Sequence, residues 1–172
     1  SSLISERQNY QAEVAQELTA SNSGSQTITG PVLVVPYKQG NLPKKLYVLP
    51  KQLNIDSTLT AEQLRRSIYT FQTYQSSSQM TGQYDTSAIA KIISSGGVID
   101  HPYIAVSISD SRGLGKVDGI TLNNKTYTFA PGARLNTSKT GLNASLQDSD
   151  LTSKPTIDFS MTLNLSGTSR IS

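Results

Sequence analysis

The feature that most constrains the fold is a segment near the end of the sequence in which apolar and polar residues alternate without interruption. The apolar positions are Ile157, Phe159, Met161, Leu163 and Leu165. The polar positions between them are Asp158, Ser160, Thr162, Asn164 and Ser166. A period of two places all the apolar side chains on one face of an extended strand. We therefore expect residues 156–166 to form a strand with one buried face.

Other segments carry weaker strand signals. Residues 104–108 alternate as well, which predicts a half-buried strand. Residues 120–129 predict a hairpin that turns at Asn123-Asn124, because asparagine tolerates the positive φ of a tight turn. Further strand candidates are residues 27–37, 45–55 and 66–84, whereas residues 130–155 indicate a loop with one short strand near 142–146.

The composition agrees with a fold made mainly of strands. Hydrophobic residues make up 35% of the chain and charged residues 16%, against roughly 45–50% and 25% in an average domain. Ser, Thr, Asn, Gln and Gly fill the difference, and these residues suit turns and solvated strand faces. The sequence predicts a mainly β fold: an antiparallel β-sandwich-like domain with polar outer faces.

Two helices are expected beside the strands. The first twenty residues carry a stripe at helical spacing, formed by Leu3, Arg7, Tyr10, Val14 and Leu18. This stripe predicts an amphipathic N-terminal helix. A short internal helix is expected at residues 87–95, ended by Gly96-Gly97. The predicted organisation is an N-terminal helix at 1–23, which would be juxtamembrane if an anchor precedes it, and one β-rich domain at 24–172.

The charge pattern argues against nucleic acid as a partner. The net charge is +3 and the pI is about 9.1, yet the basic residues are scattered. The tight basic pairs are Lys44-Lys45 and Arg65-Arg66. No basic run alternates with aromatic residues as a single-strand binding groove requires. We therefore interpret the charge as a mildly basic surface.

The sequence contains neither cysteine nor a membrane-spanning run. The absence of cysteine excludes disulfides, thiolate metal sites and cysteine nucleophiles. The longest aliphatic run is Val32-Leu33-Val34-Val35, whereas a spanning helix needs about 20 apolar residues. We expect any membrane anchor to lie outside this sequence.

Catalytic and metal-binding patterns are weak. His101 is the only histidine, so a hydrolase triad would have to use it, with Asp100 beside it. No Gly-x-Ser-x-Gly motif accompanies it, and one histidine with one carboxylate is too few ligands for a metal site. We expect no enzymatic activity, no metal and no cofactor, and we keep a hydrolase using His101 and Asp100 as an alternative.

Several short strings, in order, resemble the CreD family of bacterial inner-membrane proteins. They are Ile4-Ser5-Glu6-Arg7-Gln8, Gly30-Pro31-Val32-Leu33-Val34-Val35-Pro36-Tyr37, Leu49-Pro50, Arg65-Arg66-Ser67-Ile68-Tyr69, Ile104-Ala105-Val106-Ser107-Ile108-Ser109-Asp110-Ser111-Arg112-Gly113-Leu114-Gly115, Phe129-Ala130-Pro131-Gly132 and Leu163-Asn164-Leu165-Ser166-Gly167-Thr168. Together they span residues 4 to 168. Ser67 departs from the family pattern, because a glycine is expected at its position.

The resemblance implies an inner-membrane protein whose N-terminal anchor and further membrane helices lie outside this sequence. This chain would be the first part of its periplasmic region, linked to envelope stress and integrity. No catalytic residues carry over. The implied role is non-enzymatic interaction or sensing, with an envelope protein or cell-wall component as partner.

A small-ligand or glycan-binding β-sandwich lined by tyrosines remains an alternative. The candidate recognition residues are Asp110, Arg112, Arg65, Arg66 and Tyr69. For Asp110 we favour a structural role, in which its side chain accepts backbone N–H groups where the strand ends.

Overall fold

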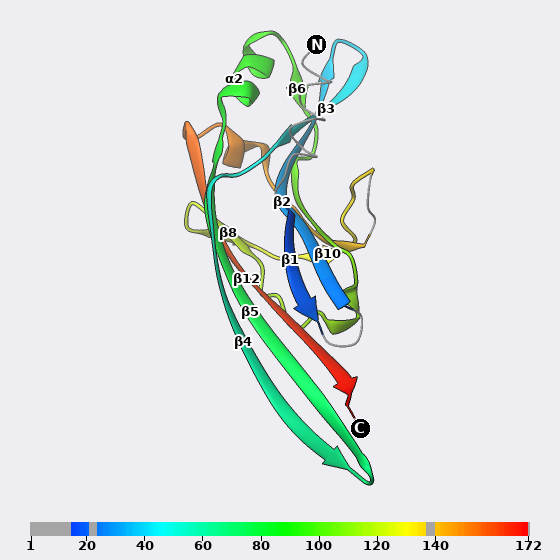
Figure 1. Ribbon diagram of the computed structural model, residues 1–172. Helices are drawn as coiled ribbons and strands as arrows, with labels where there is room; N and C mark the ends of the chain where they lie inside the picture. The colour runs from blue at the N-terminus through cyan, green and yellow to red at the C-terminus, as the bar shows by residue number, and fades with distance from the viewer. Residues whose placement is uncertain (1–14, 21–23, 137–139, 172) are drawn as a thin grey trace.

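The computed structural model describes residues 15–20, 24–136 and 140–171. Within these residues the chain forms two antiparallel sheets, one α-helix and two short 3-10 turns (Figure 1). The predicted mainly β, antiparallel fold with a short internal helix is confirmed. The helix, α2 (Ser87–Ser94), ends as predicted before Gly96 and Gly97.

The first sheet has the strand order β1-β2-β7-β11-β10, with β3 and β6 also paired to β2. Its strands are β1 (Ala15–Ala20), β2 (Gly24–Gln39), β3 (Leu42–Val48), β6 (Val98–Ile99), β7 (Tyr103–Ile108), β10 (Ala130–Pro131) and β11 (Gly141–Ser145). The register of β2 against β7 shifts between Thr29 and Val32, next to Pro31. This irregularity fits a strand that contains proline, which cannot donate a ladder hydrogen bond.

The second sheet has the order β4-β5-β12-β8-β9. Its strands are β4 (Lys51–Arg66), β5 (Tyr69–Asp85), β8 (Ile120–Leu122), β9 (Lys125–Tyr127) and β12 (Thr156–Arg170). The predicted hairpin is confirmed: Ile120 pairs with Tyr127, and Asn123 and Asn124 have φ values of 45° and 74°. Positive φ at both turn positions is the geometry that favours asparagine.

One core joins the two sheets. The alternating segment forms the centre of β12, and its five apolar side chains are all buried, as predicted. They pack in one cluster with β5 side chains such as Met80 and Tyr84 and with Ile104, Val106 and Ile108 of β7. Burial of apolar surface on facing sheets is the main stabilising contribution in such a fold.

β7 is buried on the predicted face, at Ile104, Val106 and Ile108, but its other face is also partly covered. Ala105 is fully buried, although it points away from the Ile104 side. It belongs to a second, smaller cluster that contains Val32, Val34, Tyr103, Ala133 and Leu135. β7 lies between β2 and β11, and the segment before β11 supplies the cover that the sequence pattern did not reveal.

The predicted N-terminal helix is wrong over its described part. Residues 15–20 form strand β1, which pairs with β2 from Ala15–Thr29 to Ala20–Gly24. A narrow helical stripe is weak evidence when a neighbouring segment offers a complete ladder of backbone hydrogen bonds. Residues 1–14 lie outside the described part of the chain. The domain division at residue 23 stays a prediction.

The second sheet extends beyond the common core. Figure 1 shows β4, β5 and β12 continuing together as a long blade past the rest of the molecule. We call residues 56–77 and 166–171 the arm. All β4 side chains from residue 56 to residue 66 are exposed. The predicted strand at 66–84 is β5, and its partner β4 was predicted only as far as Ile55.

Candidate functional site

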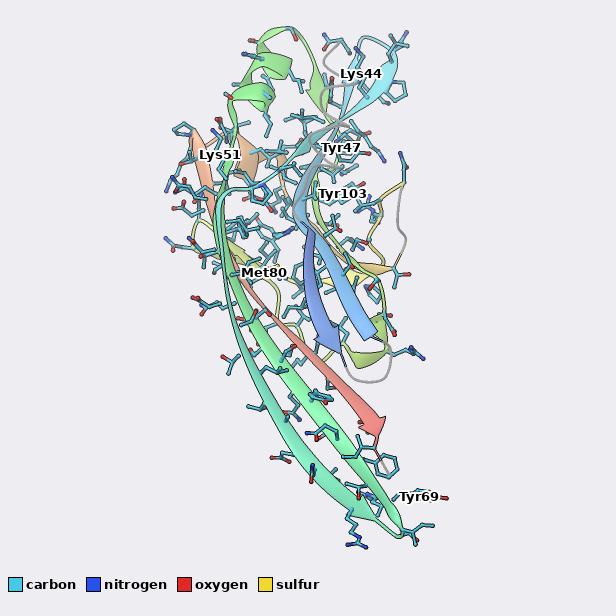
Figure 2. The ribbon with its side chains drawn as sticks, in the orientation of Figure 1. Lys44, Tyr47, Lys51, Tyr69, Met80 and Tyr103 are labelled. Atoms are coloured by element: carbon cyan, nitrogen blue, oxygen red, sulfur yellow. The ribbon has the colours of Figure 1, made fainter. Side chains whose placement is uncertain are left out.

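The end of the arm brings together three of the five candidate recognition residues. The β4–β5 ladder sets Arg66 opposite Tyr69 and Arg65 opposite Thr70. Figure 2 shows Tyr69 at the far end of the blade, opposite in the molecule to Lys44. We call residues 64–71 the arm tip. The turn consists of Ser67, at φ 58°, and Ile68.

The positive φ at Ser67 explains why the resemblance led us to expect a glycine there. Glycine adopts positive φ without a steric penalty, whereas serine adopts it at some cost. The turn nevertheless forms, because the strands on either side pair in register from Arg66–Tyr69 back to Asn54–Thr81. The ladder therefore fixes the position of the tip.

Apolar and aromatic side chains surround the two arginines. Ile68 is 76% exposed and Leu64 41% exposed. Leu64 lies opposite Phe71 in the ladder, on the same face as the Arg66–Tyr69 pair. The sequence analysis missed Leu64, Ile68 and Phe71. The available signal was the presence of apolar residues on both sides of a basic pair in a polar segment.

A surface ion pair joins β4 to β5 at the end of the sheet away from the arm tip. The Lys51 ammonium donates to the Asp85 carboxylate over 2.7 Å, joining the start of β4 to the end of β5. The Lys51 hydrogen bond, with the N–H of Ser87, lowers the pKa of Asp85 to about 2. The carboxylate therefore stays ionised and paired at neutral pH.

Asp110 and Arg112 lie at a separate place and contact each other. The Asp110 carboxylate accepts the backbone N–H of Arg112 over 3.1 Å and its guanidinium over 2.6 Å. This pairing raises the pKa of Arg112. The two residues begin the 3-10 turn η1 (Ser111–Gly113) after β7. They are not brought together with the arm tip.

Gly113 allows η1 to pack closely against the second sheet. Gly113 is not among the residues with positive φ. Its requirement is space, because a Cβ there would lie 2.0 Å from the carbonyl oxygen of Ser166 on β12. The loop can approach β12 this closely only with glycine.

Substitutions in this loop should distinguish the structural contributions of its two charged residues. Asp110→Ala is expected to lower stability by about 1 kcal/mol, because the carboxylate caps the backbone of η1. Arg112→Ala should leave the melting temperature almost unchanged, since the Arg112 side chain is 81% exposed. Thermal melts of both variants measure this. An equal drop in both would contradict it, and an unchanged melt with a lost envelope phenotype in Arg112→Ala would favour recognition.

The alternative catalytic pair lies on the surface. The His101 imidazole is 95% exposed and lies 3.5 Å from the Asp100 carboxylate. Among the described residues, no serine or threonine hydroxyl forms a hydrogen bond with it. No group of three or more potential metal ligands occurs in residues 15–20, 24–136 and 140–171. A general base needs a positioned nucleophile within hydrogen-bond reach, and this geometry offers none.

The tyrosines do not line a common concave face. Tyr84 and Tyr103 are buried, while Tyr37, Tyr47 and Tyr127 lie on three different strands. Two surface hollows of the second sheet, one beside Gln79 and Ser160 and one beside Thr58 and Gln75, contain no tyrosine.

Comparison with known proteins follows the resemblance seen in the sequence. The family model described as "Inner membrane protein CreD" matches residues 1–172. The chain belongs to the CreD family. The chain is also 28% identical to the inner membrane protein CreD of Escherichia coli (strain K12) over 182 aligned positions. That match covers 99% of this chain and 40% of the relative.

Two further findings accompany this assignment. No solved structure matches the chain. Within the part of the chain that the structure describes, no helix is long and apolar enough to cross a membrane. Membership in the CreD family supports association with the inner membrane.

Proposed function

We propose that this chain is the periplasmic part of a CreD-family inner-membrane protein and acts there as a non-enzymatic interaction domain that contributes to envelope integrity and stress responses. Its body, where two sheets share one core, is sandwich-like and serves as the scaffold. The arm is the surface through which the domain engages its partner. Family membership supports the membrane association, and the arm supports an interaction role.

The observation that carries the proposal is the exposure of the arm. Eleven consecutive β4 residues, 56–66, have exposed side chains. In the described chain β4 pairs only with β5, so its other edge presents unpaired N–H and C=O groups. A ribbon of this kind contributes little to the core, because its β4 side chains are exposed. Its length is better explained by contact with another molecule.

Two alternatives have less support. A hydrolase would have to use His101, whose ring is exposed and lacks a contacting hydroxyl. A glycan-binding face would need tyrosines gathered over one concavity, and they are distributed over several strands. Recognition by an extended, partly apolar arm requires neither a buried general base nor a ligand pocket.

The test is to shorten the arm in the full-length protein. Residues 61–74 are replaced by Asn-Gly, so that Thr60 and Gln75, which are directly opposed, flank a two-residue turn. We expect normal amounts of folded protein and loss of tolerance to an envelope-directed toxin. A His101→Ala variant serves as the control and should behave as the parent. Normal tolerance after shortening, or lost tolerance in His101→Ala, would contradict the proposal.

A further inference from the structure

We propose that the arm tip, residues 64–71, docks on the surface of an anionic phospholipid bilayer. This inference rests on the proposed function, because it names the partner that the arm meets. It is carried by three properties of the described residues: the exposed apolar side chains at the tip, the distribution of charge along the chain, and the position of the tip at the end of a projecting ribbon.

The tip exposes apolar surface that the fold does not use. Ile68 is 76% exposed at the turn itself, and Leu64 and Ile171 are 41% and 52% exposed nearby. The N–H of Ile171 donates to the carbonyl of Thr70 over 2.9 Å, which places this residue beside the tip. With Tyr69 and Phe71, these residues form a mixed aliphatic and aromatic group, a combination typical of membrane-interface contacts.

The arm tip carries basic residues and no acidic residue. Residues 63–75 and 164–171 contain Arg65, Arg66 and Arg170 but no Asp or Glu. Arg170 lies opposite Phe71 in the β12–β5 ladder. The arm tip therefore carries a local net positive charge.

The ribbon places this end away from the body. Ser57 of β4 pairs with the buried Ser78 of β5. The ten residues of β4 from Ser57 to Arg66 lead from this pair to the turn. At about 3.3 Å per residue they span roughly 30 Å. Figure 2 shows the Tyr69 end of the blade clear of the other sheet. A flat surface can meet the tip without contacting the core.

A bilayer fits this tip better than a second copy of the chain. Two such tips would bring like charges together, which is unfavourable. Pairing along the β4 edge would use the backbone and would require neither the arginines nor Ile68. At a bilayer, the apolar side chains enter the interface, and the guanidinium groups remain at the level of the phosphates.

The experiment measures co-sedimentation of the chain with phosphatidylglycerol–phosphatidylethanolamine vesicles and with phosphatidylcholine vesicles. The Arg65→Gln, Arg66→Gln variant should lose roughly 10- to 30-fold in affinity for the anionic vesicles, since each basic residue near such a surface contributes about fivefold. Ile68→Ser should weaken binding as well, by roughly tenfold. The parent should bind phosphatidylcholine weakly.

Matched controls lie at the opposite end of the molecule. Lys44→Gln, Lys45→Gln removes the same charge from β3, and Leu42→Ser removes an apolar side chain that is 64% exposed. Both should bind like the parent. Binding lost equally in the tip and control variants, or equal binding to both lipids, would overturn the proposal. Vesicle-independent dimerisation that the tip variants abolish would do so too, in favour of a second copy. None of these results bears on the arm-shortening test, which reports on the proposed function separately.

Discussion

Replacing Leu163 with Asp is expected to abolish folding. Leu163 is 1% exposed and lies at the centre of β12, opposite Ser78 of β5. Its side chain belongs to the core cluster that both sheets share. Removing the partner of a buried charge typically costs about 3–5 kcal/mol, and an introduced carboxylate here would have no partner at all. A total stability of about 5–15 kcal/mol leaves little margin for this loss.

The matched control is Thr162→Asp, which adds the same carboxylate one residue earlier. Thr162 is exposed, because it lies on the opposite face of β12. We expect this variant to express and to melt within a few degrees of the parent. Soluble yield, circular dichroism and thermal melts compare the two variants. A folded Leu163→Asp protein with a parental melt would mean that this face of β12 is not the core.

The elements that could be predicted from the sequence are those whose signal is local. In β12, alternation alone specifies which face is buried, and all five apolar residues are buried. The Asn123-Asn124 turn was predictable, because it needs two positive φ values and few residues adopt them. The helix α2 was predictable from its spacing and its glycine end.

The elements that could not be predicted depend on partners far away in the sequence. In β4, residues 56–66 are mostly polar and exposed on both faces, so no regular hydrophobic period marks them as a strand. Their conformation is set by pairing with β5, across a turn that lacks glycine. Ala105 looked solvent-facing for the same reason, since its cover comes from Ala133 and Leu135.

Only part of the candidate site could be predicted from the sequence. Arg65, Arg66 and Tyr69 were singled out by the family resemblance, and the structure places them together at the arm tip. Their setting could not be inferred, because it requires knowing that the chain reverses at Ser67 and Ile68. Without knowledge of that turn, Ile68 would be assigned to the middle of a strand.

The second large effect is expected at Tyr84, which connects the two sheets. Its side chain is fully buried, and burial raises the pKa of its phenol well above the usual value. The ring stacks on the ring of Phe159 in β12, with 4.9 Å between the ring centroids. The hydroxyl donates to the carbonyl of Pro31 in β2 over 2.7 Å. Tyr84→Ala should therefore cost about 3–5 kcal/mol, as expected for removal of a buried aromatic ring.

Two companion variants divide this loss into its causes. Tyr84→Phe keeps the ring and removes the hydrogen bond to Pro31, so it should cost only about 1 kcal/mol. Tyr74→Ala makes the same truncation on the same face of β5, ten residues away in the arm, opposite Gly167 instead of Ile157. Since Tyr74 is only half-buried, we expect a loss below about 1 kcal/mol. Denaturant unfolding measures all three variants. A loss at Tyr74 equal to that at Tyr84 would mean that the arm belongs to the cooperative core, and it would remove the reason for assigning the arm to a partner. A small loss at Tyr74 would mean that the arm adds little to the stability of the fold. Contact with another molecule would then explain its length.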